Sequence, residues 1–325
     1  MKKTINYLLS GVIAAAVLTF GGCKKKDTTL PAIGGFNSSS DIEPLNLVAY
    51  WPFSGSFTET VAGLTATPSS TAPTFVNGIK GQAYQGGGDT YINFAPGTIG
   101  SVASLTVSIW FDQTTVGGPI NNTTANYIAG QGPQGMLFMY NAATWESIQI
   151  DNEPYTPASG DSLRIHAGFS TNTSALTGAY AGAQEGLIAE GFVQNATSKW
   201  TQLVMTYDAT SSNYTLYQNG VAIGVSTAWS SAKTSAGSVQ LLTGGAPVVA
   251  GGTQPVGSLI LNSPTGLIIG GFPQVLDNTN ATYSPNSPQP WTGNFQGALD
   301  EIRIYKVALS ASEVGSLYQL ELAGR

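Results

Sequence analysis

Acidic residues gather at one place in the chain where they could perform acid–base chemistry. Glu146, Asp151 and Glu153 lie in the string ESIQIDNEP, which ends at Pro154. Hydrolysis of a glycosidic bond needs two opposed carboxyl groups, about 5–5.5 Å apart when the configuration is retained. Glu146 and Asp151 are an odd number of residues apart, which places them on opposite faces of a strand, whereas Asp151 and Glu153 share a face. Because proline is confined to strand ends and edges, we predict an edge strand that runs into a polar loop, with no catalytic residues.

The single histidine limits several other kinds of chemistry. His166 is the only one in the chain, so a histidine metal centre or a Ser-His-Asp triad would depend entirely on it. Its charge can change near neutral pH, which suits a general base or a metal ligand. No serine motif of the nucleophile-elbow type accompanies it. We therefore favour the other interpretation, an exposed or hydrogen-bonded histidine in a loop.

Sparse charge narrows the functional classes. The chain has 325 residues, 12 Lys and Arg against 18 Asp and Glu, a formal net charge of −6 and 9% charged residues. Nucleic-acid binding needs clustered Lys and Arg, so this composition excludes it. Aromatic residues make up 10% of the chain and the mean hydropathy is +0.06, which excludes a disordered acidic chain. The single cysteine excludes a disulfide framework and a cysteine zinc cluster. A β-rich extracytoplasmic binding domain or a carboxylate-based hydrolase remains.

The N-terminus has the pattern of a targeting segment. Residues 1–22 begin with the positive pair Lys2 and Lys3, and an apolar stretch with small residues after it follows over 8–20. This stretch is too short to cross a hydrocarbon layer of about 30 Å as a helix, so we predict a signal peptide. The only cysteine, Cys23, follows directly after two glycines.

The residues around Cys23 resemble the lipobox of bacterial lipoproteins, with Phe20 in place of the usual leucine. This resemblance implies that Cys23 is acylated and becomes the mature N-terminus; the alternative is a free cysteine in an ordinary cleaved signal. Residues 24–26 are lysines that can contact anionic headgroups. The rest of 23–44 has no apolar periodicity, which predicts a flexible tether. We expect a protein of the bacterial cell envelope, lipid-anchored to the outer membrane and exposed at the surface.

Short apolar runs separated by Gly, Pro, Asn and Ser predict an all-β sandwich from residue 45 onward. In 105–111 the apolar residues alternate, so one face of that strand should be buried, or both faces in a two-sided core. Asn219-Gly220 should form a turn with positive φ, and Ser310 with Glu313 should cap a short C-terminal helix. The expected strands are 47–53, 105–111, 136–140, 147–150, 200–207, 214–218, 221–225, 267–271 and 299–305.

No repeat period is visible, so we expect one domain over 45–325. That is long for a sandwich, and the surplus lies in two insertions at 151–198 and 226–265, both rich in Gly, Ser and Thr. Loops of that length in a compact fold are usually functional or carry extra strands.

Several segments, taken in order, resemble the bacterial laminin-G-like, concanavalin A-like jelly roll. This resemblance implies an all-β fold of two antiparallel sheets stacked as a curved sandwich, here with a short C-terminal helix. Such folds serve as glycan-binding lectins, adhesion modules and, in some relatives, β-glucanases, so the fold alone does not choose among them. The segments are LVAYWPFSG (47–55), GIKGQAYQGGGDTYINF (78–94), LTVSIWF (105–111), KWTQLVMTYDATSSNYTLYQNGVAIG (199–224) and FQGALDEIRIYKVALSASEVGSLY (295–318).

The resemblance also implies a structural calcium ion. Similar jelly rolls bind Ca²⁺ through the aspartate that begins the Asp-Glu-x-Arg-x-Tyr run, here Asp300, and commonly have an aspartate in the loop after the first strand. This chain departs from that pattern, because Glu59 supplies the only carboxylate there. Asp89 lies in a glycine-rich turn that often carries aspartates in the family. The alternatives are that Asp300 pairs with Arg303 or accepts backbone N–H groups, and that Asp89 only forms a turn.

Carbohydrate binding needs aromatic faces that stack on sugars, with polar groups nearby for the hydroxyls. Trp51, Trp110 and Trp200 lie in predicted strands, where packing in the core is the favoured interpretation. Aromatic residues at loop edges or in the insertions are the candidates for ligand contact: Trp145, Trp229, Trp291, Tyr155 and Tyr283.

These observations together predict a lipid-anchored lectin-like protein that binds a polysaccharide or glycoconjugate without transforming it. An adhesion or structural module that binds another envelope protein is the alternative. The third hypothesis is a glycoside hydrolase that uses Asp151, Glu153 or Asp161.

Overall fold

The computed structural model describes residues 30–325 except for several gaps. Residues Ala32–Arg325 form one compact unit and Met1–Pro31 form a separate one. No helix among the described residues is long and apolar enough to cross a membrane. The gaps are 70, 89, 98, 100–101, 114–132, 141–146, 155–161, 170, 172–187, 228–236, 244–253, 262–263, 274–275 and 277–292.

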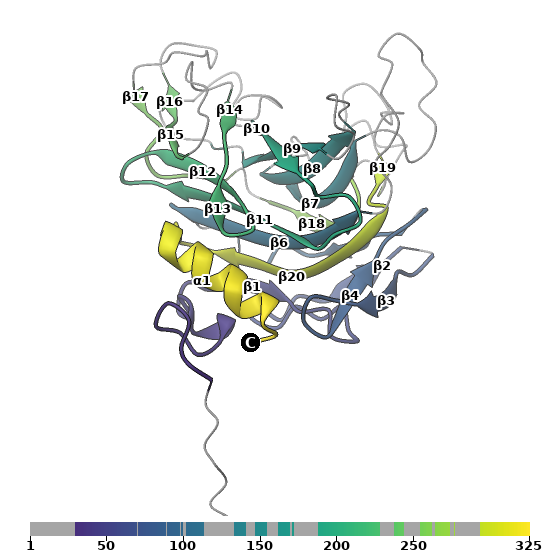
Figure 1. The fold of residues 1–325 in the computed structure, drawn as a ribbon. Coiled ribbons are helices and arrows are strands. Elements are labelled where there is room, and N and C mark those ends of the chain that lie inside the picture. The colour runs from purple at the N-terminus through teal and green to yellow at the C-terminus, as the bar shows by residue number, and fades with distance from the viewer. Residues whose placement is uncertain are drawn as a thin grey trace, which may run out of the picture. The chain divides into compact units, whose positions relative to one another are not determined.

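Short strands assemble into two sheets that lie one over the other (Figure 1). The first, which we call sheet I, has the strand order β13-β12-β11-β6-β20-β4-β3, with β1 paired to β20 and β15 paired to β12. Its strands are β1 (Leu47–Trp51), β3 (Thr74–Asn77), β4 (Gln82–Gln85), β6 (Leu105–Gln113), β11 (Thr201–Asp208), β12 (Asn213–Gln218), β13 (Val221–Ala222), β15 (Val239–Gln240) and β20 (Gly297–Tyr305).

The second, sheet II, has the order β14-β10-β9-β8-β7-β18-β5-β2, and β19 pairs with β7 in parallel. Every other pairing among the described strands is antiparallel, which confirms the predicted all-β, two-sheet jelly-roll sandwich. The small pair β16 (Leu242–Thr243) and β17 (Gln254–Pro255) lies outside both sheets. The strands of sheet II are β2 (Ala66–Pro68), β5 (Ile92–Phe94), β7 (Gln134–Tyr140), β8 (Ile148–Pro154), β9 (Ser162–Phe169), β10 (Ile188–Gln194), β14 (Val225–Thr227), β18 (Gly266–Ile269) and β19 (Gly293–Asn294).

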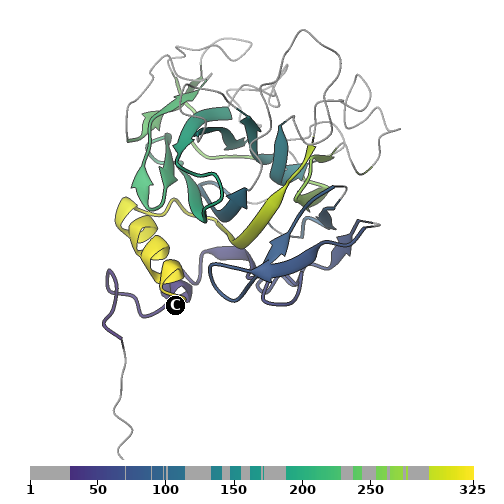
Figure 2. The same cartoon turned by 45° about the vertical axis from the view of Figure 1, so that its right-hand side comes forward.

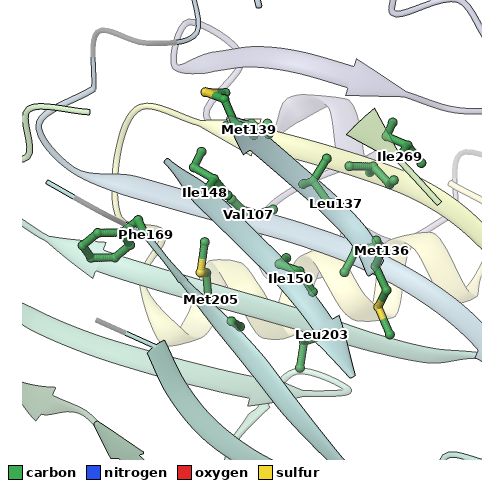
Figure 3. Close-up of a cluster of buried hydrophobic side chains, with 14 of the residues drawn as sticks. Val107, Met136, Leu137, Met139, Ile148, Ile150, Phe169, Leu203, Met205 and Ile269 are labelled. Carbon is green, nitrogen blue, oxygen red and sulfur yellow. The ribbon is translucent and has the colours of Figure 1, made fainter. Parts of the chain in front are cut away.

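The main core lies between the two sheets. In β6, the alternate residues Leu105, Val107, Ile109 and Phe111 are all buried there, as their period of two predicts. The other face of β6 is buried as well, so this strand has a two-sided core. Figure 3 shows the apolar side chains that meet in the cluster, among them Val107, Leu203 and Met205 from sheet I and Leu137, Ile148, Ile150 and Ile269 from sheet II.

The strands β11 and β12 form a hairpin, with Asp208 opposite Asn213 at its closed end. The next turn contains Asn219 with φ 51° and Gly220 with φ 77°. Both residues lie in the left-handed region that a tight hairpin turn requires. A Cβ on Gly220 would also approach Tyr318 to 3.2 Å, so both the turn and the packing need glycine.

The C-terminal helix α1 (Ala311–Leu322) covers the outer face of sheet I (Figures 1 and 2). The predicted capping box is present: the N–H of Glu313 donates to Ser310 Oγ at 3.3 Å, and the N–H of Ser310 donates to Glu313 Oε2 at 2.8 Å. Below the helix, Trp110 of β6 stacks on Tyr318 with ring centroids 5.5 Å apart. The apolar side chains of this second core are Ile42, Val204, Tyr217, Tyr305, Leu309, Val314, Leu317 and Leu320.

The segment before β1 is part of this second core. Ile42 follows the short helix η1 (Ser39–Asp41), is 1% exposed and packs with α1. The N–H of Ser39 donates to the carbonyl of Arg325 at 3.2 Å, which ties the segment to the C-terminus. Residues 33–42 therefore belong to the folded domain, in contrast to the flexible tether predicted for 23–44. Their apolar residues fill gaps beside a helix and follow no helix or strand period, so periodicity could not reveal them.

The two predicted insertions carry strands. Residues 151–198 contain the end of β8 and all of β9 and β10, which extend sheet II. In 226–265, the described residues include β15, which pairs with β12 of sheet I, and the β16–β17 pair.

Candidate functional site

Most of the residues predicted for modification or ligand contact lie outside the described residues. Asp300 and Glu59 are described. Trp51 and Trp110 are buried, as predicted for core residues, and Trp200 is half-buried. The predicted residues that the structure does not place are Cys23, Asp89, Trp145, Tyr155, Trp229, Tyr283 and Trp291.

Asp300 in β20 is a fully buried carboxylate that holds a neighbouring turn. Its Oδ2 accepts the backbone N–H groups of Ile79 at 2.9 Å and Lys80 at 3.2 Å, and its Oδ1 accepts that of Glu301 at 2.9 Å. Burial raises the pKa of Asp300 to about 8, and the nearby charge of Glu301 adds to the rise. Of the two alternatives to metal binding, the contact with backbone N–H groups is the one observed.

Glu59 has a similar role after β1, and it is 1% exposed. Its Oε1 accepts the backbone N–H groups of Tyr50 at 2.8 Å and Val61 at 2.7 Å. Its Oε2 accepts those of Ala62 at 2.6 Å and Leu64 at 3.4 Å. The carboxylate thus anchors the loop that follows β1.

These surroundings do not fit a calcium site made from Asp300 and Glu59. Calcium binds six to eight oxygen ligands. Backbone N–H donors already surround the oxygens of both carboxylates. The described residues hold no group of three or more His, Cys, Asp and Glu side chains that could bind a metal ion. Asp89 is not described, so calcium binding there stays a prediction.

A buried charge network joins β20 to α1. Arg303 donates from Nη2 to Glu301 Oε2 and from Nε to Glu321 Oε1, both at 2.7 Å, and all three side chains are 0% exposed. The guanidinium lies 3.8 Å from the ring centre of Tyr50. Trp110 donates its indole N–H to Glu321 Oε2 at 2.6 Å. Burial raises the pKa of Glu321, and the positive charge of Arg303 opposes that rise. This network is a structural joint that holds the helix on sheet I.

On the other sheet, a carboxylate faces the chain's only histidine. Asp151 in β8 and His166 in β9 are cross-strand partners, and Asp151 Oδ2 lies 3.4 Å from His166 Nδ1. Ile148 and Ile150 of the same strand point into the main core. Asp151 therefore projects from the outer face of sheet II, because successive side chains of a strand alternate between faces.

An amide completes this group. Gln149 lies on the same face and donates from Nε2 to Asp151 Oδ1 at 2.5 Å. Asp151 thus has one oxygen directed to Gln149 and the other to His166. Gln149, Asp151 and His166 form what we call the polar trio. Gln149 is 3% exposed, and its Oε1 has no hydrogen-bond partner.

The strand register gives the cross-strand neighbours of the polar trio on β9 and β10. On the outer face His166 is paired with Asp151 on one side and with position 190, a glutamate, on the other. In the adjoining row, Arg164 of β9 is paired with Glu153 of β8. Two neighbouring sets of cross-strand pairs on this side of the sheet therefore contain charged residue types.

An aromatic cluster adjoins the polar trio. Phe138 of β7 is the cross-strand partner of Gln149, and its ring centre lies 4.6 Å from that of Phe272. Tyr140 of β7 also belongs to the cluster and donates its hydroxyl to Asn93 Oδ1 at 2.9 Å. The cluster is separate from the main core and consists of Phe138, Tyr140, Ile268 and Phe272.

The position of His166 corrects the sequence analysis, which placed it in a loop. The missed signal lies in 162–169, SLRIHAGF, where Leu163, Ile165, Ala167 and Phe169 alternate and are buried. That period of two predicts a strand with its polar residues on the other face. β8 ends at Pro154, as predicted. The predicted edge strand is wrong, because β8 pairs with β7 on one side and with β9 on the other, and Asp151 and Glu153 lie within the strand and not in a loop.

The polar trio can exchange hydrogen bonds with a ligand. A carboxylate beside an imidazole orients the ring by accepting its Nδ1–H, and an amide supplies a donor and an acceptor. Of the residues predicted for a hydrolase, Asp151 is the one whose side chain the structure describes.

No protein-family model matches the chain, and no curated protein matches it. Domain 4 of AbnA, a GH43 extracellular arabinanase from Geobacillus stearothermophilus solved with arabinotriose, is similar in structure, with 16% identity, a TM-score of 0.47 and coverage of 84% of this chain and 98% of that one. The receptor-binding domain of botulinum neurotoxin type G matches with 12% identity and a TM-score of 0.46 over 85% of this chain and 51% of that one.

A SAP-like pentraxin from Limulus polyphemus matches with 10% identity and a TM-score of 0.41, over 72% of this chain and 78% of that one. The chain spans about half the length of the neurotoxin domain that it matches. These similarities are too weak to assign the ligand of any of these proteins to this chain.

Proposed function

We propose that this protein is a lipid-anchored, non-catalytic carbohydrate-binding protein of the bacterial cell envelope, and that it binds a polysaccharide or glycoconjugate on the outer face of sheet II. One observation carries the proposal: the polar trio lies beside the aromatic cluster on that face, with Gln149 directly opposite Phe138.

This combination of groups suits sugars. A sugar presents hydroxyl groups around its ring and apolar C–H faces above and below it. Amide, carboxylate and imidazole groups exchange hydrogen bonds with hydroxyls, and aromatic rings cover apolar surface. Ligand sites commonly combine an aromatic lining with a few placed polar groups. The low charge of the chain, 9% of residues, favours hydrogen bonding over ionic recognition.

The lipid anchor and the surface-exposed, outer-membrane location are carried by the sequence alone, in which Cys23 follows an apolar stretch and two glycines.

Retention on immobilised polysaccharides tests the proposal. The full chain with Cys23→Ser is passed over neutral and acidic polysaccharides, with and without a calcium chelator, and released reducing ends are measured. We expect retention of the protein without sugar release. Loss of retention with chelator would support calcium binding, and sugar release would indicate a hydrolase. Absence of retention on every glycan would contradict the proposal and favour a protein partner.

A further inference from the structure

Gln149 carries an acceptor that the protein leaves unused. Its amide orientation is set by Asp151, because a carboxylate only accepts hydrogen bonds and must face the NH₂ group of the amide. The carbonyl oxygen Oε1 therefore points away from Asp151 and has no partner, although the residue is 3% exposed. Buried polar atoms nearly always have a partner, so this oxygen marks a place for a donor from outside the chain.

We propose that the polar trio binds a hydroxyl group of an uncharged sugar and rejects acidic sugars. Gln149 Oε1 accepts the single proton of the hydroxyl. Asp151 holds the amide of Gln149 in this orientation, and His166 lies on the other side of the carboxylate. This inference rests on the proposed carbohydrate-binding function and names its ligand class.

The Asp151 carboxylate and the Gln149 acceptor give the trio its selectivity for neutral over acidic sugars. A uronic acid or a sulfated sugar brings an anionic group that can only accept hydrogen bonds, and it would meet the acceptors of Gln149 and Asp151. Like charges at close range repel, and such repulsion is an effective means of excluding a wrong ligand.

Another unused amide oxygen shows why the trio is the better ligand site. Gln202 Oε1 is also buried without a partner. Its Nε2 donates to Glu321 of α1 at 3.0 Å, so this amide is enclosed beneath the helix. The polar trio reaches the surface at His166, whose side chain is 14% exposed, while Asp151 is 1% exposed and Gln149 is 3% exposed. In the enclosed network Gln202, Arg303 and Glu321 are all 0% exposed.

The single histidine allows a direct test by NMR. In the full chain with Cys23→Ser and isotope-labelled histidine, every imidazole signal comes from His166. Neutral oligosaccharides (malto-, xylo-, arabino- and laminari-hexaose) and oligogalacturonate are titrated separately. We expect a saturable shift of the His166 signal with at least one neutral sugar and a far weaker response to oligogalacturonate.

Two variants locate the contact. Gln149→Met keeps the side-chain length and removes the acceptor, and it should weaken neutral-sugar binding about tenfold. Asp151→Asn should reduce the difference in affinity between neutral and acidic sugars. The control is Gln240→Met, which changes an exposed glutamine of sheet I and should leave affinity unchanged. Melting temperatures establish that each variant is folded.

The outcomes separate this inference from the proposed function. Preference for oligogalacturonate, or unchanged neutral-sugar affinity in Gln149→Met, would overturn the inference and leave carbohydrate binding intact. The comparison of neutral and acidic sugars is made on the wild-type side chains. It therefore still tests the inference if the Gln149→Met protein does not fold. Absence of binding to every sugar would overturn the proposed function and this inference together.

Discussion

Both outer faces of the sandwich bury carboxylates, but the hydrogen-bond partners of these carboxylates differ between the two faces. On sheet I, the oxygens of Glu301 and Glu321 accept hydrogen bonds from Tyr50, Arg303, Trp110 and Gln202, and the network is closed beneath α1. On sheet II, Asp151 has one amide and one imidazole as partners, and the amide keeps an acceptor unused.

Both groups leave polar atoms without a hydrogen-bond partner: Arg303 Nη1 and Gln202 Oε1 on sheet I, and Gln149 Oε1 on sheet II. They differ in exposure, since Arg303 and Glu321 are 0% exposed whereas the side chain of His166 is 14% exposed. Removing one partner of a buried charge pair is costly. The resemblance drew attention to Asp300 on sheet I, whereas the proposed binding face lies on sheet II.

The largest expected effect is a pH dependence of stability on the sheet I side. The pKa of folded Asp300 is raised to about 8 by burial, so the folded chain holds a proton that the unfolded chain releases near pH 4. Stability from this group is fully present below about pH 4 and is lost as the pH rises toward 8, at up to about 1.4 kcal/mol per pH unit.

Asp300→Asn cannot ionise, so the free energy of unfolding of the variant relative to the wild type should rise between pH 4 and pH 8. Denaturant unfolding at several pH values measures this. The lowered pKa values of Asp41 and Asp208 act below this window, where their stabilisation is lost as the pH falls. If the difference in the free energy of unfolding between Asp300→Asn and the wild type stays constant from pH 4 to pH 8, then Asp300 is not a buried group with a raised pKa.

The next effect concerns the charge network itself. Arg303→Met leaves Glu301 and Glu321 buried without their counter-charge, and should lower the free energy of unfolding by about 3–5 kcal/mol. The control Lys306→Met removes an exposed charge at the end of β20, and should change it by less than about 0.5 kcal/mol. Equal effects of the two substitutions would mean that the network does not hold α1.

The N-terminal segment provides a third test. Ile42→Ala removes a side chain that is 1% exposed in the second core, and should cost about 2–5 kcal/mol of stability. Leu45→Ala is the matched control, because Leu45 is 88% exposed. If residues 33–42 were a tether, Ile42→Ala would unfold at the same denaturant concentration as the control.

The smallest effect is expected at the helix cap. Ser310→Ala removes the oxygen that accepts the N–H of Glu313, and should destabilise the protein by about 1 kcal/mol. Ser310→Thr keeps a cap oxygen and should lose less. An alanine variant as stable as the wild type would show that the cap contributes nothing beyond the packing of α1 on sheet I.

Local patterns predicted much of the fold. The alternation in 105–111, the Asn219-Gly220 turn and the Ser310–Glu313 cap are each decided within a few residues, and all are present in the structure. The polar trio was not predicted, because Asp151 and His166 come from different strands and meet only through the register of β8 on β9. The partners of Arg303 likewise come from separate elements, since Glu321 lies in α1.

The most direct test of the central claim, that sugars bind on the outer face of sheet II, is the titration of the His166 imidazole signal with neutral oligosaccharides. We expect a saturable shift that Gln149→Met weakens and Gln240→Met does not. If the chain is retained on a neutral polysaccharide while the His166 signal stays unchanged at saturating sugar, the binding site lies elsewhere and the claim is wrong.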